Sequence, residues 1–161
     1  MLVYSSFISI YLSFHLQYAL PYLRKTKGNI INLSSIAHIV GGGHELPYTS
    51  SKGAIRAMTK SLAIDESKYC VRVNSISPGH IWTPMQEWFR NKQPDPEAAI
   101  QESKDSQLMG RMGTPAEIAK AALFLAADAT FCTGCDLVAS GGAELGFGHK
   151  SQVIPRCGSK N

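Results

Sequence analysis

The sequence lacks a regular cysteine framework and a basic stripe. Four cysteines occur in 161 residues, and charged side chains make up 17% of the total. The cysteines form no regular framework, which argues against a disulfide-stapled secreted scaffold and favours a reducing compartment such as the cytoplasm. The net charge of +4 is scattered without a basic stripe. We therefore expect no nucleic-acid partner.

A second Cys-x-x-Cys pair to accompany Cys132 and Cys135 is also missing. A structural zinc site needs about four ligands, and the regular histidine pair nearest to such a pattern, His38 and His44, lies in a predicted loop without a matching motif. We favour a structural role for the two cysteines over zinc binding or redox cycling, and we predict no metal site.

Residues 1–23 contain no Asp, Glu, Lys or Arg. A signal peptide would need a positively charged start and a small-residue cleavage site, and neither is present. The run is long enough to span a membrane, but serines, a histidine and a glutamine interrupt it. We expect a buried helix here, with membrane insertion as the alternative.

The length of 161 residues and the 44% apolar content suit one soluble domain. Apolar runs and turn signals predict helices, strands and loops in alternation. Thr114, Pro115 and Glu117 supply an N-cap, a first-turn proline and a capping box for the last helix. The predicted elements are a helix to about Arg24, a strand at Asn29–Leu33, a loop to Pro47, a helix at Tyr48–Tyr69, a strand at Val71–Ile76, the capped helix and a strand at Cys135–Ala139.

Ser35 and the Tyr48-x-x-x-Lys52 run carry the strongest chemical signal. Ser35 ends a buried strand, and chemistry in open α/β sheets gathers at the carboxyl ends of strands. If Tyr48 opens a helix, Lys52 lies one turn later on the same face, where its positive charge favours the phenolate. We predict that Ser35 polarises a carbonyl, that Tyr48 is the acid or base, and that Ser34 is a structural hydroxyl.

Together with two further segments, residues 71–84 and 110–142, these residues resemble the pattern of the short-chain dehydrogenase/reductase family. The resemblance implies an α/β fold: the C-terminal part of a Rossmann-type doubly wound parallel sheet, about three strands with flanking helices, over residues 1–148. Residues 149–161 are expected to form a loose tail. Within the family, residues 19–148 are most similar to hydroxysteroid dehydrogenases.

The family resemblance implies hydride transfer between NAD or NADP, with NAD favoured, and a secondary alcohol or ketone such as a hydroxysteroid. Ser35, Tyr48 and Lys52 would be catalytic, and Lys52 would also hydrogen-bond the nicotinamide ribose. The cofactor-binding residues would be Tyr48, Lys52, Pro78, Gly79, Ile81 and Thr83.

The family also implies a mobile lid over the substrate between Pro84 and Gly113, a stretch without strand pattern. Trp82, Met85 and Trp88 would offer an apolar wall to a flat substrate such as a steroid. Half-buried packing of these side chains is the alternative interpretation.

The chain departs from the family pattern near its start. No Gly-x-x-x-Gly-x-Gly turn follows a first strand, because Gly41–Gly43 follows the serine strand and the later glycines lie near the end. The family's catalytic asparagine is expected near Ile8, and residues 1–18 contain none. We interpret residues 1–18 as a divergent, replaced or misjoined N-terminus, and we expect weak or no activity of the chain alone.

The competing prediction is a non-catalytic fragment that associates with intact subunits through helices 1–24 and 48–69. A homo-oligomer is expected for the enzyme itself. The strand Asn29–Leu33 would be an exposed, apolar edge that aggregates unless it is covered.

Overall fold

The computed structural model describes residues 2–146 and 148, and for residues 2–13 it describes the backbone alone. The predicted tail at 149–161 lies outside this part. The described residues form two compact units, one from residues 2–78 and 116–139 and the other from residues 79–115 and the described residues after 139. Each unit combines segments that are distant in the sequence.

The first unit is built on a parallel sheet of three strands, β1 (Asn29–Leu33), β2 (Arg72–Pro78) and β3 (Asp136–Ala139), in the order β1-β2-β3. The register pairs Ile30 with Val73, and Ser75 with Asp136. The predicted α/β fold with three parallel strands and flanking helices is confirmed.

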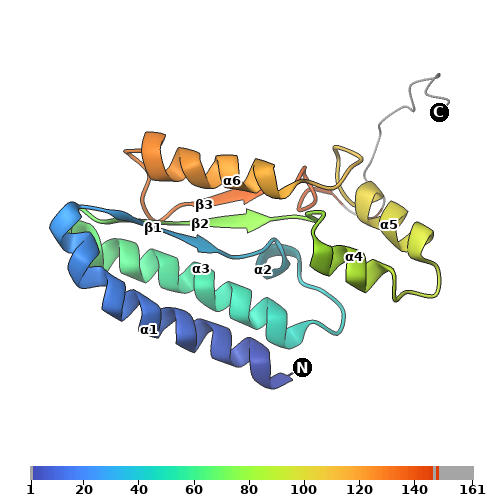
Figure 1. Ribbon diagram of the computed structural model, residues 1–161, viewed down its shortest axis with the longest axis horizontal. Coiled ribbons are helices and arrows are strands. Elements are labelled where there is room, and N and C mark those ends of the chain that lie inside the picture. Colours follow the sequence, from blue (N-terminus) through green and yellow to red (C-terminus); the bar gives the residue numbers. More distant parts are fainter. Residues whose placement is uncertain (1, 147, 149–161) are drawn as a thin grey trace. The chain divides into compact units, whose positions relative to one another are not determined.

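Helices cover both faces of this sheet, as a parallel sheet requires. Figure 1 shows α1 (Leu2–Thr26) and α3 (Leu46–Glu66) on one face, and α6 (Pro115–Leu123) on the other. A π-helical turn, η2 (Phe124–Asp128), continues α6. Two buried clusters fill the layers: Leu16, Leu20, Ile30, Ala63, Val71 and Val73 on the first face, and Ile76, Leu125 and Ala129 on the second.

One face of α1 packs into the protein, as predicted for a buried helix. Leu16 and Leu20 are buried, whereas Tyr18 and Tyr22 are exposed. No helix within the part of the chain that the structure describes combines the length and apolar character that a membrane span requires. The buried interpretation of this segment therefore fits the packing.

A charged contact ties the end of α1 to the end of α3. The Arg24 guanidinium donates from Nε and Nη2 to the two carboxylate oxygens of Glu66, each at 2.7 Å, and lies 4.4 Å from the centroid of the Tyr69 ring. The hydrogen bonds from Arg24 lower the pKa of the buried Glu66 carboxyl, although its burial acts in the opposite direction. The pair fixes how the two helices lie together.

The segment between β1 and α3 differs in part from the predicted loop. It contains a short helix, α2 (Ala37–Val40), and α3 begins at Leu46, two residues before the predicted start, with Pro47 in its first turn. The α-helix ends at Glu66 and a 3₁₀ turn, η1 (Ser67–Tyr69), follows. A four-residue helix is too short to show a periodic pattern, which is why the sequence did not reveal α2.

The second unit contains α4 (Pro84–Arg90) and α5 (Pro96–Asp105). Each begins with a side-chain cap, since Thr83 accepts from Gln86 N–H and Asp95 accepts from Ala98 N–H. Between Pro84 and Gly113 no strand forms, as predicted; Gly113 makes only an isolated bridge to Ile81.

Candidate active site

Ser34 and Ser35 lie where β1 ends, beside the end of β2. Hydrogen bonds continue the ladder past β1: Ser34 N–H donates to Ile76 O at 2.8 Å, and Ile36 N–H donates to Pro78 O at 3.1 Å. The residues before and after Ser35 are therefore both hydrogen-bonded to β2. This places Ser35 and Pro78 together at the carboxyl edge of the sheet, where the sequence predicted chemistry.

The two serine hydroxyls have different partners. Ser35 Oγ accepts a hydrogen bond from Ala37 N–H at 3.2 Å, which leaves its own proton available for a substrate oxygen. Ser34 is buried, and its hydroxyl donates to Lys52 O at 2.9 Å. Ser34 thus has the structural role that the sequence predicted for it.

Lys52 joins the tyrosine helix to the end of β1. Its Nζ donates to Leu33 O at 3.1 Å and lies 5.6 Å from the centroid of the Tyr48 ring. Partial burial lowers the pKa of the Lys52 ammonium. The Tyr48 side chain is 40% exposed. The structure therefore brings the Tyr48 ring and the Lys52 ammonium together at the end of the strand that precedes Ser35.

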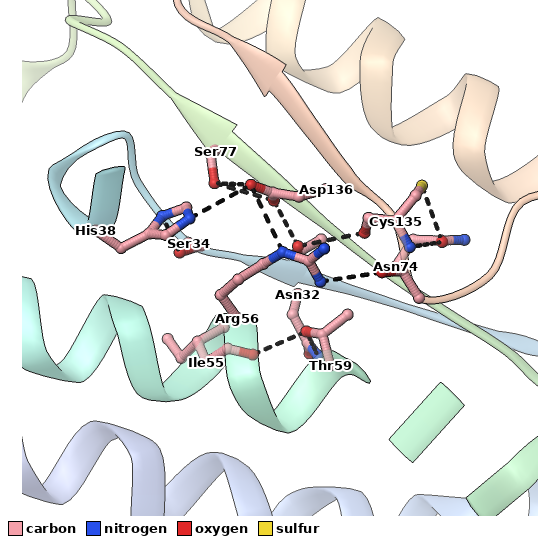
Figure 2. A network of polar contacts seen from close by, with 12 residues as sticks. Asn32, Ser34, His38, Ile55, Arg56, Thr59, Asn74, Ser77, Cys135 and Asp136 are labelled. Atoms are coloured by element: carbon pink, nitrogen blue, oxygen red, sulfur yellow. Dashed lines mark hydrogen bonds and ion pairs between the residues drawn. The ribbon is translucent and has the colours of Figure 1, made fainter. Parts of the chain in front are cut away.

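A polar network lies between the sheet and helices α2 and α3, and sequence reasoning missed it. Figure 2 shows the Asp136 carboxylate of β3 at its centre. Ser75 donates to this carboxylate at 2.5 Å and Ser77 at 2.8 Å, while His38 Nε2 lies 3.7 Å and Arg56 Nε 3.9 Å from it. Ser75 and Ser77 alternate along a strand buried on both faces, and this unusual pattern could have signalled the network.

In the second unit, the predicted cofactor residues are Gly79, Ile81 and Thr83. A Cβ on Gly79 would lie 2.8 Å from Ser140 Cα, so only glycine allows the two chain segments to approach so closely. Ile81 pairs with Gly113, and Thr83 Oγ caps α4. Contact between these residues and a nicotinamide stays a prediction.

The predicted substrate wall belongs to the second unit as well. Trp82 is 37% exposed, Met85 66% and Trp88 53%. The Trp88 ring meets Phe89 edge to face at 5.0 Å between centroids, and Lys92 Nζ lies 3.8 Å from the Trp88 ring. These side chains form an accessible apolar surface, and their contact with substrate stays a prediction.

Cys132 and Cys135 form part of a turn that Asn74 holds. Asn74 Nδ2 donates to Cys132 O at 2.8 Å, and Cys135 N–H donates to Asn74 Oδ1 at 3.2 Å. Burial, and then the neighbouring Cys132, raises the pKa of the Cys135 thiol, which disfavours a reactive thiolate. Among the residues placed by the structure, no cluster of His, Cys, Asp or Glu could hold a metal ion. The turn therefore supports the structural role predicted for the pair.

Comparison with known proteins decides the family. The family model described as enoyl-(acyl carrier protein) reductase matches residues 6–144. The chain belongs to the short-chain dehydrogenase/reductase family. L-fucose dehydrogenase of Bos taurus is 57% identical over 138 residues, which make up 85% of this chain and 51% of that protein.

Solved short-chain dehydrogenase/reductase structures agree with the fold. Cj0485 dehydrogenase matches with a TM-score of 0.77 and 33% identity, over 80% of this chain and 50% of that one. ElxO with NADP bound matches with a TM-score of 0.69 and 30% identity, over 80% of this chain and 51% of that one. The chain spans about half the length of the curated relatives it matches.

The residues at the end of β1 fit the nicotinamide-ribose part of the cofactor that the family uses. Lys52 donates one of its three ammonium hydrogens to Leu33 O, and an ammonium has two more for ribose hydroxyls.

Within the described residues, no Gly-x-x-x-Gly-x-Gly turn opens a helix that could hold the pyrophosphate part of the cofactor. Gly142, Gly146 and Gly148 have the Gly-x-x-x-Gly-x-Gly spacing, but they follow β3, and the placed residues there form turns without opening a helix. A helix N-terminus is the usual partner of a pyrophosphate.

Proposed function

We propose that this chain carries the proton-transfer part of an NAD(P)-dependent dehydrogenase site that acts on a secondary alcohol or its ketone. The observation that supports it best is the Lys52 ammonium, held by Leu33 O beside the Tyr48 ring at the end of the serine strand. A bound nicotinamide would accept or supply the hydride.

Three side chains would then handle the substrate oxygen. Tyr48 removes the hydroxyl proton during alcohol oxidation and returns it during ketone reduction. Ser35 donates its free proton to the same oxygen and orients it. Lys52 places its ammonium beside the Tyr48 ring and turns its remaining hydrogens towards the ribose.

For the substrate, we propose L-fucose first and a hydroxysteroid second. The first follows from the name of the 57% identical bovine relative. The second follows from the resemblance to 17-beta-hydroxysteroid dehydrogenase type 14 and from the apolar surface of Trp82, Met85 and Trp88. We propose NAD as the cofactor, with NADP, the ligand of ElxO, as the comparison.

Turnover by the full chain tests this proposal. Oxidation of L-fucose and of a hydroxysteroid is followed by NADH absorbance, and NADH binding is followed by fluorescence. We expect slow turnover and weak binding because, in the residues that the structure describes, no Gly-x-x-x-Gly-x-Gly turn opens a helix that could hold the pyrophosphate. Ordinary micromolar binding would contradict the expected weakness. Tyr48→Phe should abolish turnover.

The matched control for Tyr48→Phe is Tyr22→Phe, because Lys25 Nζ lies 5.9 Å from the exposed Tyr22 ring in a similar pair. This variant should leave turnover unchanged. Turnover that survives Tyr48→Phe would overturn the proposed role of Tyr48.

The second candidate function is a non-catalytic, cytoplasmic subunit that joins longer family members. Tyr18 and Tyr22 of α1 and Ile64 of α3 are large exposed side chains that such an association would cover. Co-purification of the tagged chain with co-expressed bovine L-fucose dehydrogenase tests it. Recovery of both chains in one complex supports this candidate, and separate elution contradicts it.

A further inference from the structure

His38 is held between the end of the serine strand and the buried Asp136 carboxylate. Its Nδ1 lies 2.6 Å from Ser35 O, and its Nε2 lies 3.7 Å from Asp136 Oδ2. The side chains of His38 and Asp136 are 14% and 9% exposed. Figure 2 shows the imidazole pointing from α2 across to Asp136. One ring thus joins α2, the serine strand end and β3.

The partner at Nδ1 determines where the ring carries its hydrogen. Ser35 O is a carbonyl oxygen and only accepts, so His38 Nδ1 must donate. Ser34 Oγ lies 3.4 Å from the same nitrogen, and its own proton goes to Lys52 O. The neutral ring is therefore the Nδ1–H tautomer, with Nε2 directed at Asp136.

Asp136 is a firmly anchored end for this contact. Two serine hydroxyls of β2 donate to its carboxylate, and Arg56 of α3 adds a positive charge 3.9 Å away. Arg56 is itself fixed, because its Nη1 donates to Gly134 O at 3.0 Å. A carboxylate with this many partners holds its position, and the imidazole packs beside it.

We propose that His38 is a positioning residue for Ser35: its Nδ1–H fixes the Ser35 carbonyl, and through it the seryl main chain, while the ring packs beside Asp136 of β3. The proposal rests on the proposed function, in which the Ser35 hydroxyl must meet the substrate oxygen. A small displacement of such a group lowers the rate steeply. His38 acts through Ser35 and touches no reacting atom.

NMR tests the geometry without any turnover. In ¹⁵N-labelled full chain, the ring nitrogens of neutral His38 should report the Nδ1–H tautomer, and the Nε2–H tautomer would overturn the proposal. The Ser35 and Ile36 amide signals should move in His38→Ala and return in His38→Asn, because asparagine places an amide N–H near the position of Nδ1. Ile39→Ala is the matched control on the same short helix, with an exposed side chain.

Kinetics test the consequence. His38→Ala should lower kcat about tenfold to a hundredfold with an unchanged KM for NAD⁺. His38→Asn should recover most of the loss, and Ile39→Ala should resemble the wild type. Equal losses in both His38 variants, or a wild-type rate in His38→Ala, would overturn the proposal. A wild-type chain without turnover would instead overturn the proposed function, and the tautomer and amide signals would still decide the role of His38.

Discussion

At the scale of single residues, Lys52 connects chemistry with stability. Its ammonium is partly buried, and burial lowers its pKa below the ordinary value of 10.5. Because its pKa is lowered in the folded state, the Lys52 ammonium loses its proton at a lower pH in the folded chain than in the unfolded chain. The folded state therefore gains relative stability as the pH rises from the lowered pKa towards 10.5.

This pKa shift gives a prediction for Lys52→Met, which has no titrating group at that position. The melting temperature of the wild type relative to Lys52→Met should rise between pH 7 and pH 10.5, because only the wild type is relieved of a buried charge. Thermal unfolding across this range measures the difference. A difference that is constant with pH would contradict the burial of the ammonium.

Alanine substitutions at two glycines should change the stability of the protein in opposite directions. Gly79→Ala should destabilise the protein, because the added Cβ would lie 2.8 Å from Ser140 Cα and from Ser140 O, which are main-chain atoms that cannot turn aside. Gly53→Ala, inside α3 with open space around it, should stabilise by about 0.5–1 kcal/mol. Denaturant unfolding compares the two variants, and equal effects would refute the crowding at Gly79.

At the scale of elements, the helix layer depends on the contact between α1 and α3. The lowered pKa of Glu66 means that the folded state resists protonation of this carboxyl. The stability due to the Arg24–Glu66 pair is therefore present above the ordinary pKa of 4.5 and is lost as the pH falls through the lowered pKa.

Glu66→Gln tests this contact. The variant should melt at a lower temperature than the wild type at pH 7, and the gap should close as the pH falls below 4.5. Melting curves from pH 7 to pH 2.5 give the measurement. Asp65→Asn on the same turn, where the side chain is exposed, is the control, and a gap that persists at low pH would exclude the ion pair as its cause.

The packing of the opposite face of the sheet depends on η2, which contributes the buried Leu125. Leu125 is 1% exposed and belongs to the second buried cluster, whereas Leu123, two residues earlier, is 64% exposed. Leu125→Ala should cost about 3 kcal/mol through lost burial and a residual cavity. Leu123→Ala should change the stability by less than about 0.5 kcal/mol. Urea unfolding of both variants checks the packing, and similar losses would contradict it.

At the scale of the whole molecule, β1 is an edge strand within the described part of the chain, where it pairs with β2 alone. Leu33 at its end is 54% exposed. Unpaired main-chain groups beside exposed apolar side chains promote strand pairing between molecules. Leu33→Lys should therefore slow aggregation, because charge on an edge strand opposes pairing. Light scattering at fixed concentration measures this, and unchanged scattering would point to another surface.

Much of the first unit was predictable because its signals are local. Strands β1 and β2 are short segments that contain isoleucine or valine between turn signals, and the helix with Tyr48 and Lys52 is long enough to be periodic. The contact of Lys52 with Leu33 O and the partners of Asp136 were not predictable. They join residues 19 to 98 positions apart, and only the parallel register brings them together.

Pro78 shows how one residue limits the sheet. A proline nitrogen carries no hydrogen, so the main chain of β2 can accept but cannot donate at this position. Its carbonyl accepts from Ile36 N–H, so this position of β2 faces the end of β1 and not β3. The chain beyond β1 can therefore donate to residue 78 but receives no main-chain hydrogen bond from it. The consequence is a one-sided attachment next to Ser35, in which Ile36 is held through its own N–H alone.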